Sequence, residues 1–168
     1  MKLIQLLFLS ALLSGCNNPS PTTSSSKLDT STGLYRVTSD NTSMNLAIAR
    51  ATISIDQFDK AFENNDSAYS DFAVKKKYDT EDAGEHMWIA VTKIVDGNYQ
   101  GYVNNDAEET REVKYGDSVV VLKDEITDWM YLDNNVLKGG YTIREIRNRL
   151  SKEEQLQLDK ELGFKIED

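Results

Sequence analysis

The chain has 168 residues, a formal net charge of -9 and a hydrophobic content of 39%. This length suits one domain with a single core. Because the acidity opposes contact with phosphate backbones, we expect no nucleic-acid partner. One cysteine and one histidine exclude an internal disulfide, a CxxC metal site and a zinc site with two histidines. No cofactor or metal is therefore expected.

Residues 1–15 are predicted to be an export signal, because Lys2 is followed by a short apolar run and then by small residues. The run is too short to span the hydrocarbon core of a membrane. The segment Leu13-Ser14-Gly15-Cys16 resembles the lipobox of bacterial lipoproteins. This resemblance implies cleavage before Cys16 and acylation of its thiol. The alternative is an ordinary secretory signal that contains a chance cysteine.

Residues 16–39 are predicted to be a lipidated cysteine followed by a flexible tether. Asn, Pro, Ser and Thr make up residues 17–26, and such a segment cannot bury a core. Two or three acyl chains would anchor the chain stably to a membrane. We therefore expect the bacterial cell envelope as its location. In a Gram-negative host, Asn17 resembles the residue that sorts lipoproteins to the outer membrane, facing the periplasm.

Residues 40–168 are predicted to form a single α+β domain. The domain begins with a long helix over residues 41–64, because apolar residues there recur at spacings of three and four. An antiparallel meander of about five strands follows, over residues 72–78, 87–95, 99–104, 119–122 and 126–132. Asp96-Gly97 is typical of the tight turn between two of these strands.

Two short helices are predicted at the C-terminus, each opened by a capping box. Thr142 with Glu145 opens the first, and Ser151 with Glu154 opens the second. Gly163 is expected to end the second helix. We expect the helices to cover one face of the sheet.

Five short segments together resemble an uncharacterised bacterial domain family typified by the YegJ lipoprotein. The segments, which span nearly all of the predicted domain, are Leu46–Ala51 with Phe58, Glu85–Ile89, Gly101–Asn105, Ile126–Trp129 and Gly139–Thr142. The family has no assigned activity, so the resemblance implies a type of domain and no mechanism. Trp88 and Asn104 lie in two of these segments and are included among the candidate binding residues.

Asp128-Trp129 is the first candidate site. Asp128 falls on the apolar side of its predicted strand, and an unpaired buried carboxylate is very costly. Asp128 therefore either pairs with structural partners, with Trp129 packed beneath a helix, or faces a cleft.

Gly139-Gly140 precedes a predicted helix, with Tyr141 and Arg144 close by in the sequence. Free amides at a helix start bind carboxylates or phosphates. The alternative is a turn followed by a capped helix with exposed arginines.

His86 is a candidate base or hydrogen-bond donor near neutral pH, or else a structural histidine. The sequence offers no GxSxG motif to partner it. Acidic pairs are numerous, but their spacing alone does not select two catalytic carboxylates.

The sequence favours a non-catalytic binding module that contacts another envelope protein through its sheet or its Trp129 region. An inhibitor or immunity protein is a specific variant of this hypothesis. The alternative from another class is a small envelope hydrolase that uses Asp128 and a second carboxylate, with His86 assisting.

Overall fold

The computed structural model describes residues 28–29, 34–35, 42–81 and 84–167. The chain divides into two compact units, residues 1–40 and 41–168. In the first unit, strands β1 (Leu28–Asp29) and β2 (Leu34–Tyr35) pair antiparallel. These two strands fall within the segment predicted as a tether. The predicted signal, Cys16 and the rest of the tether lie outside the described residues.

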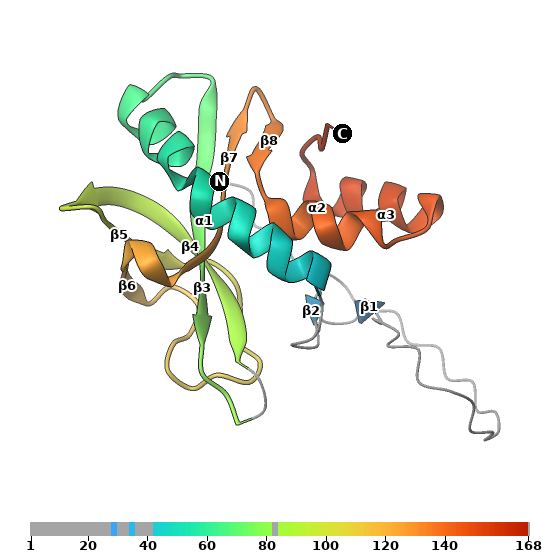
Figure 1. Cartoon of the computed structure of the whole chain (residues 1–168), viewed down its shortest axis with the longest axis horizontal. Helices are drawn as coiled ribbons and strands as arrows, with labels where there is room; N and C mark the ends of the chain where they lie inside the picture. Colours follow the sequence, from blue (N-terminus) through green and yellow to red (C-terminus); the bar gives the residue numbers. More distant parts are fainter. Residues whose placement is uncertain (1–27, 30–33, 36–41, 82–83, 168) are drawn as a thin grey trace. The chain divides into compact units, whose positions relative to one another are not determined.

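The second unit has the predicted α+β class, with three α-helices and a six-stranded antiparallel sheet (Figure 1). Its elements in chain order are α1 (Thr42–Asn64), β3 (Tyr69–Tyr78), β4 (Glu85–Val95), β5 (Asn98–Val103), β6 (Ser118–Val121), β7 (Ile126–Asp133), β8 (Val136–Gly139), α2 (Tyr141–Asn148) and α3 (Lys152–Leu162). None of the helices in the described ranges is both long and apolar enough to cross a membrane.

The sheet differs from the predicted meander in its order and in its strand count. The strand order is β6-β5-β4-β3-β7-β8, so only β3 to β6 form a meander. After β6 the chain passes through a 3-10 helix, Lys123–Glu125, and β7 then pairs with the edge of β3 opposite to β4. Local alternation predicts that residues 126–132 form a strand, but it carries no information about which neighbour that strand will choose.

The sixth strand, β8, was missed at residues 136–139. It pairs with β7 through a hairpin whose turn residues, Asn134 and Asn135, have φ of 48° and 65°. Asparagine tolerates this left-handed conformation, and two such residues in succession make the tight turn that favours a hairpin. The sequence signal for this hairpin was therefore present in Asn134-Asn135, but the predicted meander ended at residue 132.

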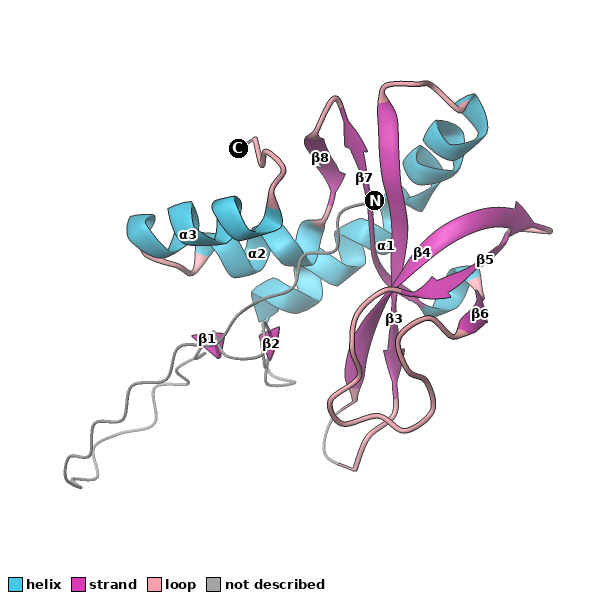
Figure 2. Ribbon diagram, turned by 180° about the vertical axis from the view of Figure 1, so that it is seen from behind, coloured by secondary structure: helices cyan, strands magenta, loops and turns pink. Residues whose placement is uncertain are grey.

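Helix α1 covers one face of the sheet, as its apolar spacing predicts. Ala51, Ile55 and Phe58 of this helix are buried in the same core cluster as Val74, Ile89, Tyr99 and Trp129 of the strands. The ring of Phe58 lies 6.0 Å from that of Trp129 and 5.8 Å from that of Tyr99. In Figure 2, the view from behind, β3 and β4 lie in front of α1.

The ends of α3 agree with the prediction from its sequence. Ser151 Oγ accepts the amide of Glu154, and the Glu154 side chain accepts the amide of Ser151, which is the reciprocal capping box. Gly163 ends the helix in the left-handed conformation, at φ 72°.

The long loop between β5 and β6 is held by one buried carboxylate. Glu85 accepts the amides of Glu108, Glu109 and Thr110 at 2.8–3.0 Å. Burial raises the pKa of Glu85, but these three donors outweigh it, so the net pKa is below its ordinary value. Glu85 is therefore a structural anion that fixes the course of the loop.

Candidate functional site

Asp128 is fully buried at the junction of β7, β8 and α2. One oxygen accepts the amides of Trp129 and Tyr141 at 2.8 and 3.1 Å. The other accepts the amide of Thr142 at 2.8 Å and the hydroxyl of Thr142 at 2.6 Å. All four partners are donors, which is the environment that an ionised carboxylate requires inside a protein. The structure thus gives Asp128 structural partners.

Lys75 places a positive charge near this carboxylate. Its Nζ lies 2.8 Å from Thr142 Oγ1 and 4.6 Å from the centre of the Trp88 ring. Burial lowers the pKa of Lys75, and the Asp128 charge opposes that shift. Burial also raises the pKa of Asp128, while Lys75 and the hydrogen bonds oppose it. Each charge therefore offsets part of the other's desolvation cost.

Helix α2 begins differently from the prediction. Its N-cap is Gly140, whose φ is 62°, and not a residue whose own side chain caps the helix. The first amides of the helix, those of Tyr141 and Thr142, are instead satisfied by Asp128 from β7. The predicted capping box on Thr142 is wrong because the Thr142 hydroxyl donates to Asp128. Asp128 also occupies these two amides, which the anion-binding hypothesis had taken to be free.

Gly139 and Gly140 are explained by close packing. Both have positive φ, and a Cβ on Gly139 would lie 2.3 Å from the carbonyl oxygen of Trp129. The amide of Gly140 donates to that same oxygen at 2.7 Å. The two glycines therefore let the chain leave β8, pass against β7 and enter α2 at once.

Trp129 is only 1% exposed and joins β7 to α1. Its Nε1 donates to the carbonyl oxygen of Ala51 at 3.0 Å and lies 3.2 Å from Ser54 Oγ. Its ring stacks at 6.2 Å with Tyr131 and meets Tyr141 edge-on at 5.8 Å. The indole is therefore part of the core and packs beneath α1, which is one of the two alternatives that the sequence left open for the Asp128-Trp129 pair.

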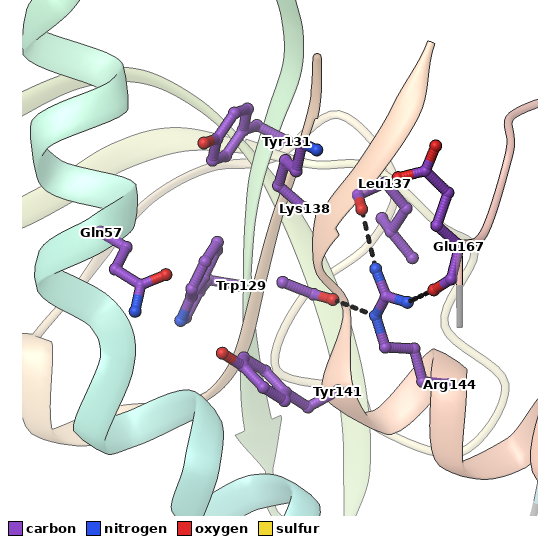
Figure 3. A pocket seen from close by; sticks show the side chains of 9 residues that line it. Gln57, Trp129, Tyr131, Leu137, Lys138, Tyr141, Arg144 and Glu167 are labelled. Atoms are coloured by element: carbon purple, nitrogen blue, oxygen red, sulfur yellow. Dashed lines mark hydrogen bonds between the residues drawn. The ribbon is translucent and has the colours of Figure 1, made fainter.

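A hollow of about 370 Å³ lies against these rings, between α1 and the β8–α2 connection (Figure 3). Residues from five segments line it: Gln57, Trp129, Tyr131, Leu137, Lys138, Gly139, Tyr141, Arg144 and Glu167. Figure 3 shows the ring of Trp129 between Gln57 and the β8 side of the hollow. The site thus combines an aromatic wall with an amide, two cationic side chains and one carboxylate.

Arg144 supports the β8 side of this hollow. Its Nε donates to the carbonyl oxygen of Gly139 at 2.9 Å and its Nη2 to that of Leu137 at 2.8 Å. Its Nη1 donates to the carbonyl oxygen of Glu167. Arg144 is therefore not an exposed anion receptor: its guanidinium ties β8 and the C-terminal tail to α2.

Six of the nine candidate binding residues meet at this junction, namely Asp128, Trp129, Gly139, Gly140, Tyr141 and Arg144. His86, Trp88 and Asn104 do not line the hollow. His86 and Trp88 pair across strands with Lys77 and Lys75, and Nδ1 of His86 lies 2.9 Å from Thr127 Oγ1. The backbone amide of Asn104 donates to the carbonyl oxygen of Trp88, and its side chain is exposed.

Sequence reasoning did not single out Gln57, Lys138 and Glu167 as site residues. They come from α1, β8 and the C-terminal tail, and no local spacing connects them. Within residues 42–81 and 84–167, no group of three His, Cys, Asp or Glu side chains is placed to hold a metal ion.

Comparison with known proteins shows the family of this domain. Residues 41–166 match the family described as "Uncharacterized protein conserved in bacteria (DUF2314)". The chain belongs to this family. It is 31% identical to the uncharacterized protein YegJ of Escherichia coli over 119 residues, which are 71% of this chain and 76% of YegJ.

A second relative is a Neisseria meningitidis protein that is named as an ankyrin repeat protein. The two are 39% identical over 85 residues, which are 50% of this chain. The match spans only 33% of that relative's length. No solved structure matches the chain.

The environment of His86 predicts a histidine that stays neutral well below neutral pH. Burial, then the charges of Lys75 and Lys77, lower the pKa of His86 from 6.5 to about 4. The pKa of His86 is lower in the folded chain than in the unfolded chain. Its contribution to the free energy of unfolding is therefore fully present above pH 6.5 and is lost as the pH falls toward 4, by up to about 3 kcal/mol. An NMR titration of the single imidazole measures this pKa directly. Lys75→Met should raise it, and a wild-type value of 6.5 or higher would contradict the geometry.

Proposed function

We propose that this chain is a non-catalytic binding module of the bacterial cell envelope, anchored to the membrane through a lipid on Cys16. Another envelope protein is its partner and contacts it at the hollow between α1 and the β8–α2 connection. The aromatic wall of that hollow carries the proposal. A partner that is a toxin or an enzyme would make the chain an immunity or inhibitor protein.

The composition of the hollow supports binding. Tyr131 and Tyr141 are half-buried over the core ring of Trp129, so they combine a fixed position with accessible surface. Aromatic side chains held in this way supply much of the binding energy at protein interfaces. Gln57 and Lys138 place polar groups at the hollow, where they would set orientation and specificity.

The hydrolase alternative has less support from the geometry. A two-carboxylate mechanism needs two carboxyl groups on either side of a cleft. Glu167 is the one carboxylate residue among those that line the hollow, and Asp128 is buried with both oxygens occupied. His86 is engaged elsewhere, with Thr127. The residues that line the hollow therefore lack a second carboxyl group to act with Glu167.

The proposed anchor rests on the sequence, because Cys16 is the single cysteine and stands at the end of Leu13-Ser14-Gly15-Cys16. The Neisseria relative supports a domain that is used in more than one setting, since the match occupies only a third of that longer chain. An anchor that belongs to this chain and not to the domain would fit such reuse.

Replacing Cys16 tests the anchor. In the host bacterium, Cys16→Ser should abolish incorporation of labelled palmitate and remove the chain from the membrane fraction, because no thiol remains to be acylated. Ser20→Thr, in the predicted tether outside the lipobox, is the control and should stay in the membrane fraction. Membrane retention of the Cys16→Ser chain would contradict lipidation as the anchor.

Photo-crosslinking in living cells tests the binding site. A photoreactive phenylalanine analogue at position 57 or 138, in the full chain, should give one discrete adduct, because both positions line the hollow. The same analogue at Glu153, an exposed position on α3, is the control and should not give that adduct. Identical adducts from all three positions, or none from any, would contradict the proposed site. Turnover of an envelope substrate that depends on Glu167 would support the hydrolase instead.

A further inference from the structure

The face of the sheet opposite α1 carries polar side chains that the hollow does not use. Met87 and Ile89 of β4 are buried in the core cluster with α1. His86 and Trp88 alternate with them along the strand, so their side chains lie on the other face. Figure 2 shows β3 and β4 from this side, in front of α1. Both side chains are half-buried, and neither lines the hollow beside Trp129.

Two lysines of β3 lie beside these two residues. The register pairs Lys77 with His86 and Lys75 with Trp88. Nζ of Lys75 is held 2.8 Å from Thr142 Oγ1 and 4.6 Å from the centre of the Trp88 ring. Lys77 is exposed, and in the described part of the chain it makes no ion pair. An uncompensated positive charge therefore lies next to His86.

The hydroxyl of Thr127 determines which nitrogen of His86 carries the hydrogen. Thr127 Oγ1 donates to the carbonyl oxygen of Lys75 at 3.2 Å, so its hydrogen is not available to the imidazole. Nδ1 of His86 must therefore donate to Thr127 Oγ1, which lies 2.9 Å away. A neutral imidazole has one N–H, so Nε2 carries a lone pair. Burial and the two neighbouring lysines lower the pKa of His86 to about 4, which keeps the ring neutral at pH 7.

The lone pair of Nε2 faces solvent. The contact with Thr127 at Nδ1 is the one hydrogen bond of the imidazole in the described part of the chain. Every buried side-chain nitrogen or oxygen among the described residues has a hydrogen-bond partner. Since Nε2 has none, it is not buried. A ligand at this face therefore meets a hydrogen-bond acceptor at His86 and a positive charge at Lys77.

We propose that His86, Lys77 and Trp88 form a binding site for a sugar acid, which is a sugar that carries a carboxylate. The carboxylate pairs with the ammonium of Lys77, and a hydroxyl of the sugar donates to Nε2 of His86. The apolar C–H surface of the sugar ring lies against the indole of Trp88. This site is on the other face of the sheet from the hollow, so it is additional to the protein contact proposed there.

The donors and acceptors of the site favour a sugar acid over other ligands. A phosphodiester or a simple carboxylate has only acceptor oxygens, which would face the lone pair of His86 Nε2. The dense charge of a nucleic acid also meets a chain of net charge -9. A neutral sugar would leave Lys77 without an anion. A uronic acid carries a carboxylate and a hydroxyl on neighbouring carbons of one rigid ring, so both contacts form with little loss of entropy.

The first test is an NMR titration of the full chain in detergent with D-galacturonate. The single histidine and the two tryptophans are separate reporters. We expect saturable shifts at His86 and Trp88 and none at Trp129, which is buried in the core. Lys77→Gln should raise the Kd at least about tenfold, and Lys93→Gln, at an exposed position further along β4, should leave it unchanged. No saturable shift, or equal effects of the two substitutions, would overturn the proposal.

The second test varies the ligand and needs no variant of the chain. D-galactose lacks the carboxylate and acetate lacks the hydroxyl, so each should bind at least about tenfold more weakly than D-galacturonate. Acetate that binds as tightly would show a general anion site and overturn the proposal. Oligogalacturonate distinguishes the source of the sugar, because tighter binding per sugar unit indicates a polymer and equal binding a free sugar acid. His86→Gln, which keeps an acceptor, should retain more binding than His86→Phe, and the reverse order would contradict the acceptor role.

Discussion

The buried carboxylate of Asp128 is the constraint on which the junction of β7, β8 and α2 depends. It replaces the N-terminal cap that α2 lacks, by accepting the amides of Tyr141 and Thr142 from a neighbouring strand. Through Thr142 it is linked to Lys75 on β3. Since a buried charge without these partners would be very costly, the position of α2 relative to the sheet is narrowly restricted. The hollow against Trp129 takes its shape from that restriction.

This arrangement separates the groups that hold the fold from the groups that face solvent. Asp128, Gly139 and Arg144 are occupied within the chain, while Gln57 is exposed and Tyr131, Lys138 and Tyr141 are half-buried. A binding module needs rigid support beneath its contact residues, because a contact group that is already ordered loses less entropy on binding.

The elements that the sequence predicts well are those whose signal is local. The spacing of apolar residues gave α1 to within one residue, and Asp96-Gly97, with φ of 50° and 75°, gave the β4–β5 turn. The pairing of β7 with β3 was not predictable, because alternation does not name a neighbour. The sequence also could not decide whether Asp128 has structural partners or faces a cleft. The helix amides that it accepts lie 13 and 14 residues further along the chain. Gln57 and Lys138 are neighbours only after folding.

The most direct test of the account is a double-mutant cycle between Asp128 and Thr142, measured by denaturant unfolding of the full chain. We predict that Asp128→Asn lowers the free energy of unfolding by at least about 2 kcal/mol, since an amide cannot accept all four donors. The double variant Asp128→Asn with Thr142→Val should lose less free energy of unfolding than the sum of the losses in the two single variants, by at least about 0.5 kcal/mol. An Asp128→Asn chain as stable as the wild type, or strict additivity, would contradict a structural role for this carboxylate.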